Sequence, residues 1–77
     1  MIEVRMEDHF WQGDGEAVLT TWYVDDGDHV DIGDTIADIM MEKTQIEIEA
    51  PASGIIRLRA APEQPLRKGD IIAVIET

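Results

Sequence analysis

The sequence has 77 residues, no cysteine and a formal net charge of −11. A chain this short supports one small core, so residues 1–77 are predicted to form a single domain without disulfides or thiolate metal sites. The acidity disfavours nucleic acid and anionic membrane as partners and suits docking against basic protein surfaces. No apolar run reaches membrane-spanning length and the N-terminus does not have the pattern of a signal peptide, so a cytoplasmic location is expected.

The first part of the chain is predicted to form two strands joined by a loop. Residues 2–6 alternate apolar and polar side chains, as a half-buried strand does. The glycines near the end of residues 7–15 indicate a loop. Phe10 and Trp11 within it are predicted to cover the edge of the core, with an exposed contact patch as the alternative. Residues 16–24 are rich in β-forming side chains and predict a longer, bent strand.

The rest of the chain continues as short strands and turns. Gly27, with its freedom to take positive φ, marks a turn over residues 25–28. We find no convincing helical periodicity, so the predicted fold class is all-β. The later strands are expected at residues 35–39, 46–49, 56–60 and 71–75, with turn-like segments at 30–34 and 62–65.

A hairpin with a lysine near its tip is the feature around which the chain is organised. The strands at 35–39 and 46–49 flank a few polar residues, with Glu42 and Lys43 near the tip. Because the tip contains neither Gly nor Asn, a loop based on a type I turn is predicted rather than a tight primed turn. The hairpin is expected to be anchored in the core by Ile39, Ile46 and Ile48.

An internal repeat predicts how the strands are arranged. Residues 30–39 match residues 66–75 without a gap, and residues 2–4 resemble residues 46–48. Two similar halves suggest a pseudo-twofold sandwich of two small sheets. The turn after the first repeat then corresponds to the C-terminal end of the chain, so the lysine tip is expected to project away from both termini.

Other chemistries find little support in the sequence. The acidic segment at residues 25–31 lacks the ligand spacing of an EF-hand loop. His9 and His29 are isolated in loops, and Ser53 has no nucleophile elbow around it. A chain with so small a core has little room for a concave active site. No catalytic or metal-binding residue is therefore predicted.

The order and spacing of several motifs resemble those of a lipoyl domain, the swinging-arm module of 2-oxoacid dehydrogenase acyltransferases (E2 components). The resemblance covers essentially the whole chain. The motifs that carry it are Glu16-Ala17-Val18-Leu19 with Trp22, Asp26-Gly27-Asp28-His29-Val30, Ile32-Gly33-Asp34, Ala37 to Thr44, Ile46-Glu47-Ile48, Ala50-Pro51-Ala52-Ser53-Gly54 and Gly69 to Ile75.

This resemblance implies a flattened barrel of two four-stranded antiparallel sheets, with lipoate attached covalently to Lys43. Glu42 and Thr44 are the residues that the modifying enzyme would recognise. The domain would be a monomeric, non-catalytic carrier that shuttles acyl groups and electrons, either free-standing or within a dihydrolipoamide acyltransferase. Its implied partners are a thiamine-diphosphate-dependent dehydrogenase, an acyltransferase, dihydrolipoamide dehydrogenase and the lipoate-attaching enzyme.

Departures from the family pattern keep two alternatives open. The tip has Glu42 and Thr44 where the family usually has Asp and Ala, while biotinyl domains have Met on both sides of the lysine. Met40 and Met41 keep a biotin carboxyl carrier modified on Lys43 as the first alternative. The second is an unmodified β-sandwich that serves as an interaction module. Residues 9–12 stand where the family has a compact turn near the lysine. The resemblance therefore does not determine which partners this domain visits.

Overall fold

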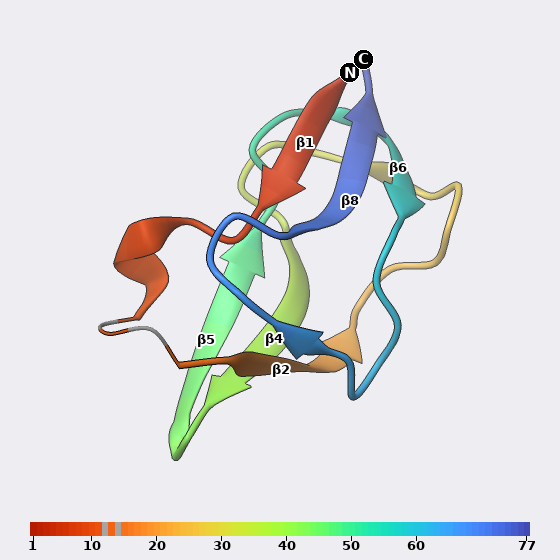
Figure 1. The fold of residues 1–77 in the computed structure, drawn as a ribbon. Helices are drawn as coiled ribbons and strands as arrows, with labels where there is room; N and C mark the ends of the chain where they lie inside the picture. The colour runs from red at the N-terminus through yellow and green to blue at the C-terminus, as the bar shows by residue number, and fades with distance from the viewer. Residues whose placement is uncertain (12, 14) are drawn as a thin grey trace.

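The computed structural model describes residues 1–11, 13 and 15–77. They form two four-stranded sheets, with strand orders β1-β8-β6-β3 and β5-β4-β2-β7, in which every pairing is antiparallel (Figure 1). The predicted all-β fold of two sheets is confirmed. The strands are β1 (Ile2–Arg5), β2 (Ala17–Trp22), β3 (His29–Val30), β4 (Thr35–Met41), β5 (Thr44–Glu49), β6 (Gly54–Leu58), β7 (Pro65–Leu66) and β8 (Ile71–Glu76).

Three short elements were not expected from the sequence. β3 and β7 have two residues each and lie at the sheet edges, in segments that were predicted as turn or loop. A two-residue strand is too short to show an alternation of apolar and polar side chains in the sequence. β3 is therefore defined only by its pairing with β6, and β7 only by its pairing with β2. A single 3-10 turn, η1 (Asp8–Phe10), lies in the predicted loop at 7–15. Gln12 and Asp14 of that loop lie outside the described residues.

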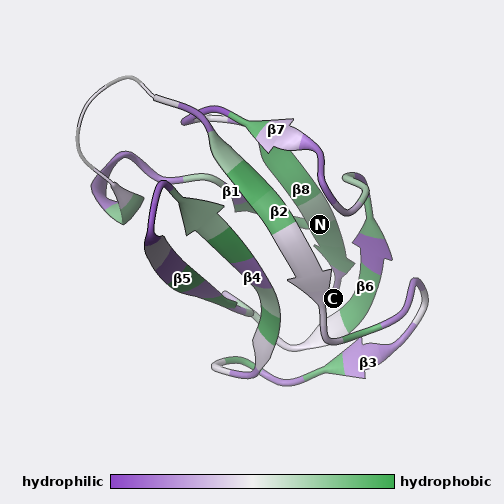
Figure 2. Ribbon diagram, turned by 90° about the horizontal axis from the view of Figure 1, so that it is seen from below, coloured by the Kyte–Doolittle hydropathy of each residue, from purple (hydrophilic) through white to green (hydrophobic). Residues whose placement is uncertain are grey.

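The core lies between the two sheets and is built from aliphatic side chains of both. Hydrophobic residues are frequent in β2, β4 and β8, whereas β5 and most of the connecting turns are largely hydrophilic (Figure 2). Of the expected hairpin anchors, Ile39 and Ile48 are buried and Ile46 is partly buried against the core. The largest fully buried side chains are Met6, Leu19, Val30, Ile36, Ile39, Ile48, Ile56, Leu66, Ile72 and Ile75.

The predicted pseudo-twofold relation is confirmed by the strand order. Exchanging β1 with β5, β2 with β6, β3 with β7 and β4 with β8 converts one sheet order into the other. The register follows the same rule: Ile2 pairs with Ile75, as Ile46 pairs with Ile39. The bulge in β2 between Leu19 and Thr21 adds one residue that β6 lacks.

Four turns share one hydrogen-bond pattern. In each turn the fourth backbone N–H donates to the first carbonyl, and the fourth side chain accepts from the first N–H. The third residue has positive φ in every case, which favours glycine. The four turns are Asp25–Asp28, Asp31–Asp34, Ala61–Gln64 and Arg67–Asp70.

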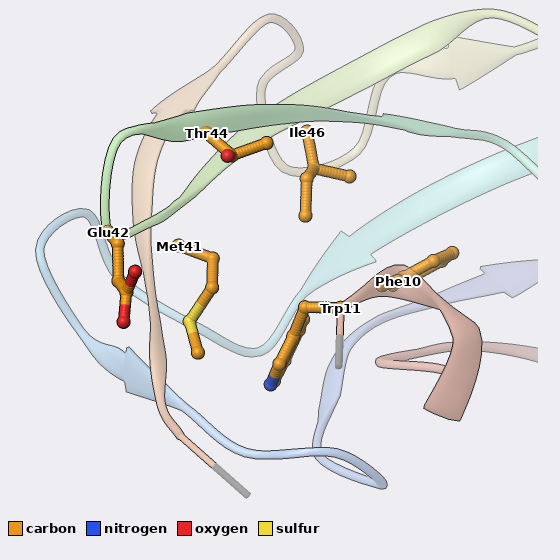
Figure 3. Close-up of a pocket in the computed structure, with 6 residues that line it drawn as sticks. All are labelled: Phe10, Trp11, Met41, Glu42, Thr44 and Ile46. Carbon is orange, nitrogen blue, oxygen red and sulfur yellow. The ribbon is translucent and has the colours of Figure 1, made fainter. Parts of the chain in front are cut away.

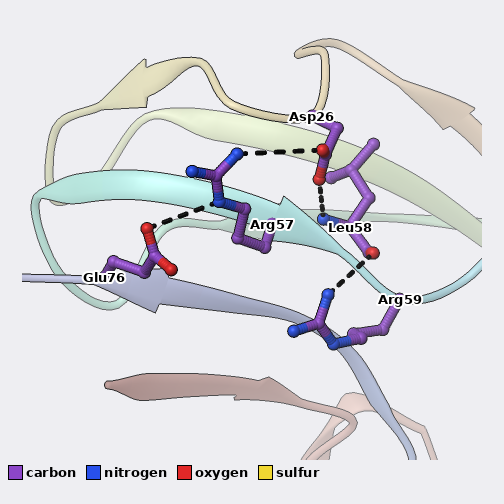
Figure 4. Close-up of polar contacts among 5 residues, drawn as sticks. All are labelled: Asp26, Arg57, Leu58, Arg59 and Glu76. Carbon is purple, nitrogen blue, oxygen red and sulfur yellow. Dashed lines mark hydrogen bonds and ion pairs between the residues drawn. The ribbon is translucent and has the colours of Figure 1, made fainter.

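The turn at residues 25–28 is tied to β6 by side chains as well as by backbone. Asp26 Oδ1 accepts a hydrogen bond of 2.8 Å from the Leu58 N–H, and its other oxygen lies 3.9 Å from Arg57 Nη1 (Figure 4). Arg57 Nε also lies 3.4 Å from Glu76 Oε1. These contacts are partly exposed, so they orient the turn more than they stabilise the fold.

Helices long and apolar enough to cross a membrane are absent from the part of the chain that the structure describes.

Candidate functional site

Lys43 lies at the apex of the β4–β5 hairpin. The two strands pair from Thr35 and Glu49 at the base to Met41 and Thr44 at the top, so only Glu42 and Lys43 form the turn. The Lys43 side chain is exposed. The tip and the two termini lie at opposite ends of the molecule, as predicted from the repeat (Figure 1). The hairpin therefore presents one primary amine to solvent, far from both chain ends.

The predicted loop based on a type I turn is wrong. The turn has two residues, and Glu42 has a φ of 56°, in the left-handed region. Tight turns with positive φ match the right-handed twist of paired strands, so strand pairing up to Met41 and Thr44 outweighs the strain at Glu42. That strain is of the order of 1 kcal/mol. The result is a narrower and stiffer tip than the sequence suggested.

The hairpin is held firmly because β4 lies inside its sheet. It pairs with β5 on one side and with β2 on the other. Ile39 is fully buried and Ile48 is 2% exposed, so the arm is fixed to the core below the tip. At its base, Ala50 exchanges backbone hydrogen bonds with Gly33 and Asp34, at 2.9 and 2.8 Å.

A buried carboxylate on β4 links the two strands of the hairpin to the residue that follows β2. Asp38 is 3% exposed, and its Oδ2 accepts hydrogen bonds from the Tyr23 hydroxyl and, at 2.6 Å, from Gln45 Nε2. The bond to Asp38, with a smaller contribution from burial, raises the pKa of Tyr23 above its ordinary value. Among the described residues, Asp38 Oδ1 has no hydrogen-bond partner. The sequence analysis did not predict this network, because it depends on the register of the hairpin and on the pairing of β2 with β4.

The described residues of the loop at 7–15, called the early loop from here on, lie against the β4–β5 hairpin. Trp11 is 7% exposed within the core cluster and Phe10 is partly buried against it, so the predicted covering role is confirmed. Trp11 Nε1 donates a 3.0 Å hydrogen bond to the Gly15 carbonyl. A hollow of about 260 Å³ separates the loop from the tip (Figure 3). Its lining residues are Phe10, Trp11, Met41, Glu42, Thr44 and Ile46.

The other candidates from the sequence remain isolated. His9 and His29 are exposed beside Glu7 and Asp31, at 3.6 and 3.8 Å. Ser53 accepts a 2.9 Å hydrogen bond from the Ile32 N–H, which is a role in a turn. Within residues 1–11, 13 and 15–77, no three His, Cys, Asp or Glu side chains gather as metal ligands.

Lys68, the second lysine, differs from Lys43 in its surroundings. It is partly buried, and its Nζ lies 5.8 Å from the centre of the Trp11 ring, within range of a cation–π contact. It belongs to the turn at Arg67–Asp70, far along the chain from the hairpin. Of the two lysines, Lys43 is therefore the one displayed on a protruding turn between neighbouring strands.

Comparison with known proteins agrees with this geometry. Residues 12–75 match the biotin–lipoyl family, described as "Biotin-requiring enzyme". The chain is 33% identical over 61 residues to the dihydrolipoyllysine-residue acetyltransferase component of the acetoin cleaving system of Pseudomonas putida. It is 37% identical over 62 residues to the corresponding component of the pyruvate dehydrogenase complex of Zymomonas mobilis. Each match covers 78% of this chain, but only 16% and 14% of those relatives.

The fold also matches a solved structure. The lipoyl domain of the 2-oxoglutarate dehydrogenase complex from Azotobacter vinelandii superimposes with a TM-score of 0.80, at 20% identity, over 100% of this chain and 98% of that one. The chain belongs to the biotin–lipoyl family. Its predicted class, a lipoyl carrier domain, is confirmed, and the biotin alternative is not favoured.

Proposed function

We propose that Lys43 is the lipoylation site of this carrier domain and that the domain itself is non-catalytic. The observation that carries the proposal is the exposed Lys43 amine at the apex of a two-residue turn. An enzyme that acylates this amine must enclose it in its own active site, and a protruding tip permits this without unfolding the domain. The amide that forms removes one positive charge and changes the formal net charge from −11 to −12.

The residues of the chain would supply position rather than chemistry. Lipoate, once attached, provides a dithiolane whose sulfurs exchange acyl groups and electrons. The buried Ile39 and Ile48 hold the hairpin rigid, so the amine projects at a constant distance from the core. Glu42 and Thr44 flank the lysine and are exposed, and we assign them to recognition by the lipoate-attaching enzyme.

The partners follow from the relatives. Both are named as dihydrolipoyllysine-residue acetyltransferase components, one of an acetoin cleaving system and one of a pyruvate dehydrogenase complex. We propose that this domain likewise visits a thiamine-diphosphate-dependent dehydrogenase, an acyltransferase and dihydrolipoamide dehydrogenase in the cytoplasm. The net charge of −11 favours docking against basic surfaces around their active sites.

Intact mass spectrometry tests the attachment site. We would co-express the chain with a lipoate-attaching enzyme and, separately, with a biotin ligase, each with its acid supplied. The wild type and the Lys68→Arg control should each gain one lipoyl group, because both retain Lys43. Lys68 is not expected to be modified, since it is partly buried against Trp11. Lys43→Arg should fold with the same circular dichroism spectrum and gain none.

Three outcomes would contradict the proposal. Lipoylation of Lys43→Arg would show that lipoate is attached to a residue other than Lys43. Biotin on the wild type without lipoate would establish the biotinyl carrier instead. A folded wild type modified by neither enzyme would identify an interaction module.

A further inference from the structure

We propose that the hollow between the early loop and the hairpin is a resting seat for the dithiolane carried by Lys43. This inference rests on the proposed lipoylation and adds a second position for the arm. The arm would alternate between solvent, where partner enzymes reach it, and the surface of its own domain. Phe10, Trp11, Met41 and Ile46 would form the apolar part of the seat.

The hollow begins where the arm begins. Glu42 and Thr44, the two neighbours of Lys43, are themselves part of its lining. Met41 and Thr44 are the last pair of the β4–β5 ladder, so the rim of the hollow is the end of the hairpin (Figure 3). A group tethered at that rim meets the hollow at an effective concentration on the order of millimolar, so a contact with a dissociation constant in that range or below it is populated.

The lining suits a sulfur-containing ring. In Figure 3 the side chains of Met41, Ile46 and Trp11 point toward the same space. Apolar and aromatic surface favours the apolar dithiolane, and divalent sulfur makes favourable contacts with aromatic rings such as Trp11. The volume of about 260 Å³ exceeds the roughly 150 Å³ of a cavity that accommodates benzene, so the hollow has room for the ring.

The walls are fixed before the arm arrives. Trp11 is held by its 3.0 Å hydrogen bond to the Gly15 carbonyl, and the Lys68 ammonium lies over its ring. The Met41 methyl group lies against Gly15, where a Cβ would collide with it. A preformed seat costs little ordering free energy when it is filled. Its open side and two polar lining residues, Glu42 and Thr44, keep the contact reversible.

Met40 and Met41 offer a matched pair of variants for the test. Both are partly buried on β4, but successive strand residues face opposite sides, and only Met41 lines the hollow. We would prepare the wild type, Met41→Gln and Met40→Gln in unmodified and fully lipoylated forms, verified by intact mass. Phe10→Ala provides a second variant of the lining, away from the turn, in case Met41→Gln resists lipoylation.

Two measurements report on the seat without any assay of the complex. Nuclear Overhauser contacts should join the lipoyl ring to Ile46 and Trp11 in the wild type and in Met40→Gln. A tenfold preference for the seated arm should raise Tm by about 5–10 °C on lipoylation. In Met41→Gln and Phe10→Ala, both the contacts and most of this rise should be lost.

The outcomes separate the two proposals. A lipoylated wild type with no ring contacts and an unchanged Tm would overturn the seat while leaving the carrier function intact. An equal loss in Met40→Gln and Met41→Gln would also overturn it, because the effect would then not depend on the hollow. Absence of lipoylation would instead contradict the proposed function.

Discussion

Asp38 is the residue that departs furthest from the apolar character of its strand. It is 3% exposed on β4, between the buried Ala37 and Ile39. A carboxylate at such a position is costly unless it is hydrogen-bonded, and Tyr23 and Gln45 provide the bonds. Because Gln45 lies on β5 and Tyr23 follows β2, the group joins the hairpin to the interior of its sheet.

The Tyr23 hydroxyl makes this network sensitive to alkaline pH. Its pKa is raised above the ordinary value of 10.0, mainly by the bond to Asp38. A raised pKa of the folded state means that the stabilisation is fully present below pH 10 and is lost as the pH rises through the raised pKa. Tyr23→Phe should therefore be less stable than the wild type at neutral pH, and the difference should vanish at high pH.

Two measurements check this expectation. Tyr23 is the only tyrosine, so ultraviolet titration of the phenol reads its pKa directly. Urea unfolding at several pH values gives the difference in free energy between the wild type and Tyr23→Phe. A phenol that titrates at or below its ordinary pKa, or a difference that persists at high pH, would contradict the network.

At the scale of elements, the four related turns differ at the position that needs positive φ. Gly27, Gly33 and Gly69 occupy it in three turns, with φ near 90°, but Glu63 occupies it in the fourth, with a φ of 68°. Non-glycine residues in this region are strained by their Cβ atoms. The turn at residues 61–64 forms nonetheless, since Glu63 N–H donates a 2.6 Å bond to the Leu19 carbonyl.

This comparison predicts opposite signs for two kinds of substitution. Gly33→Ala and Gly69→Ala should each lower the free energy of unfolding by about 1–2 kcal/mol, because both sites have positive φ and open space around the new Cβ. Glu63→Gly should raise it by up to about 1 kcal/mol. Urea denaturation measures all three, and a destabilised Glu63→Gly would mean that its side chain makes a compensating contact.

At the scale of the whole molecule, the pseudo-twofold relation predicts paired energetics. Ile36 on β4 and Ile72 on β8 occupy equivalent positions and are both fully buried. Ile36→Val and Ile72→Val should each cost about 0.5–1.5 kcal/mol, since each removes one methylene from the same core. Thermal unfolding of the two variants checks this. If one costs several times more than the other, the two halves pack differently despite their matched topology.

The same relation places Lys43 opposite the two chain ends. The hairpin turn at Glu42 and Lys43 and the pair of chain ends are equivalent positions. One half closes its ladder with a turn that carries the lysine, and the other leaves the ladder open as the N- and C-termini (Figure 1). The exposed Lys43 amine therefore projects from the end of the molecule opposite the two termini.

The sequence by itself determined the all-β class, the long strands, the repeat and the location of Lys43 at a hairpin tip. Each of these follows from local pattern: apolar alternation, glycines at turns, and matched segments 36 positions apart, such as those ending at Ile39 and Ile75. Such signals need no knowledge of distant neighbours.

The tertiary structure alone decided the two-residue strands β3 and β7, the positive φ of Glu42, the Asp38 network and the hollow beside Trp11. Each depends on which segments meet in space. Pairing between sheet neighbours imposes the tight turn against the preference of Glu42, and packing of the early loop on the hairpin creates the hollow. The short strands, the hollow and the Tyr23 contact join separate parts of the chain, while within the hairpin the pairing of β4 with β5 overrides the preference of single residues, so local pattern does not encode these features.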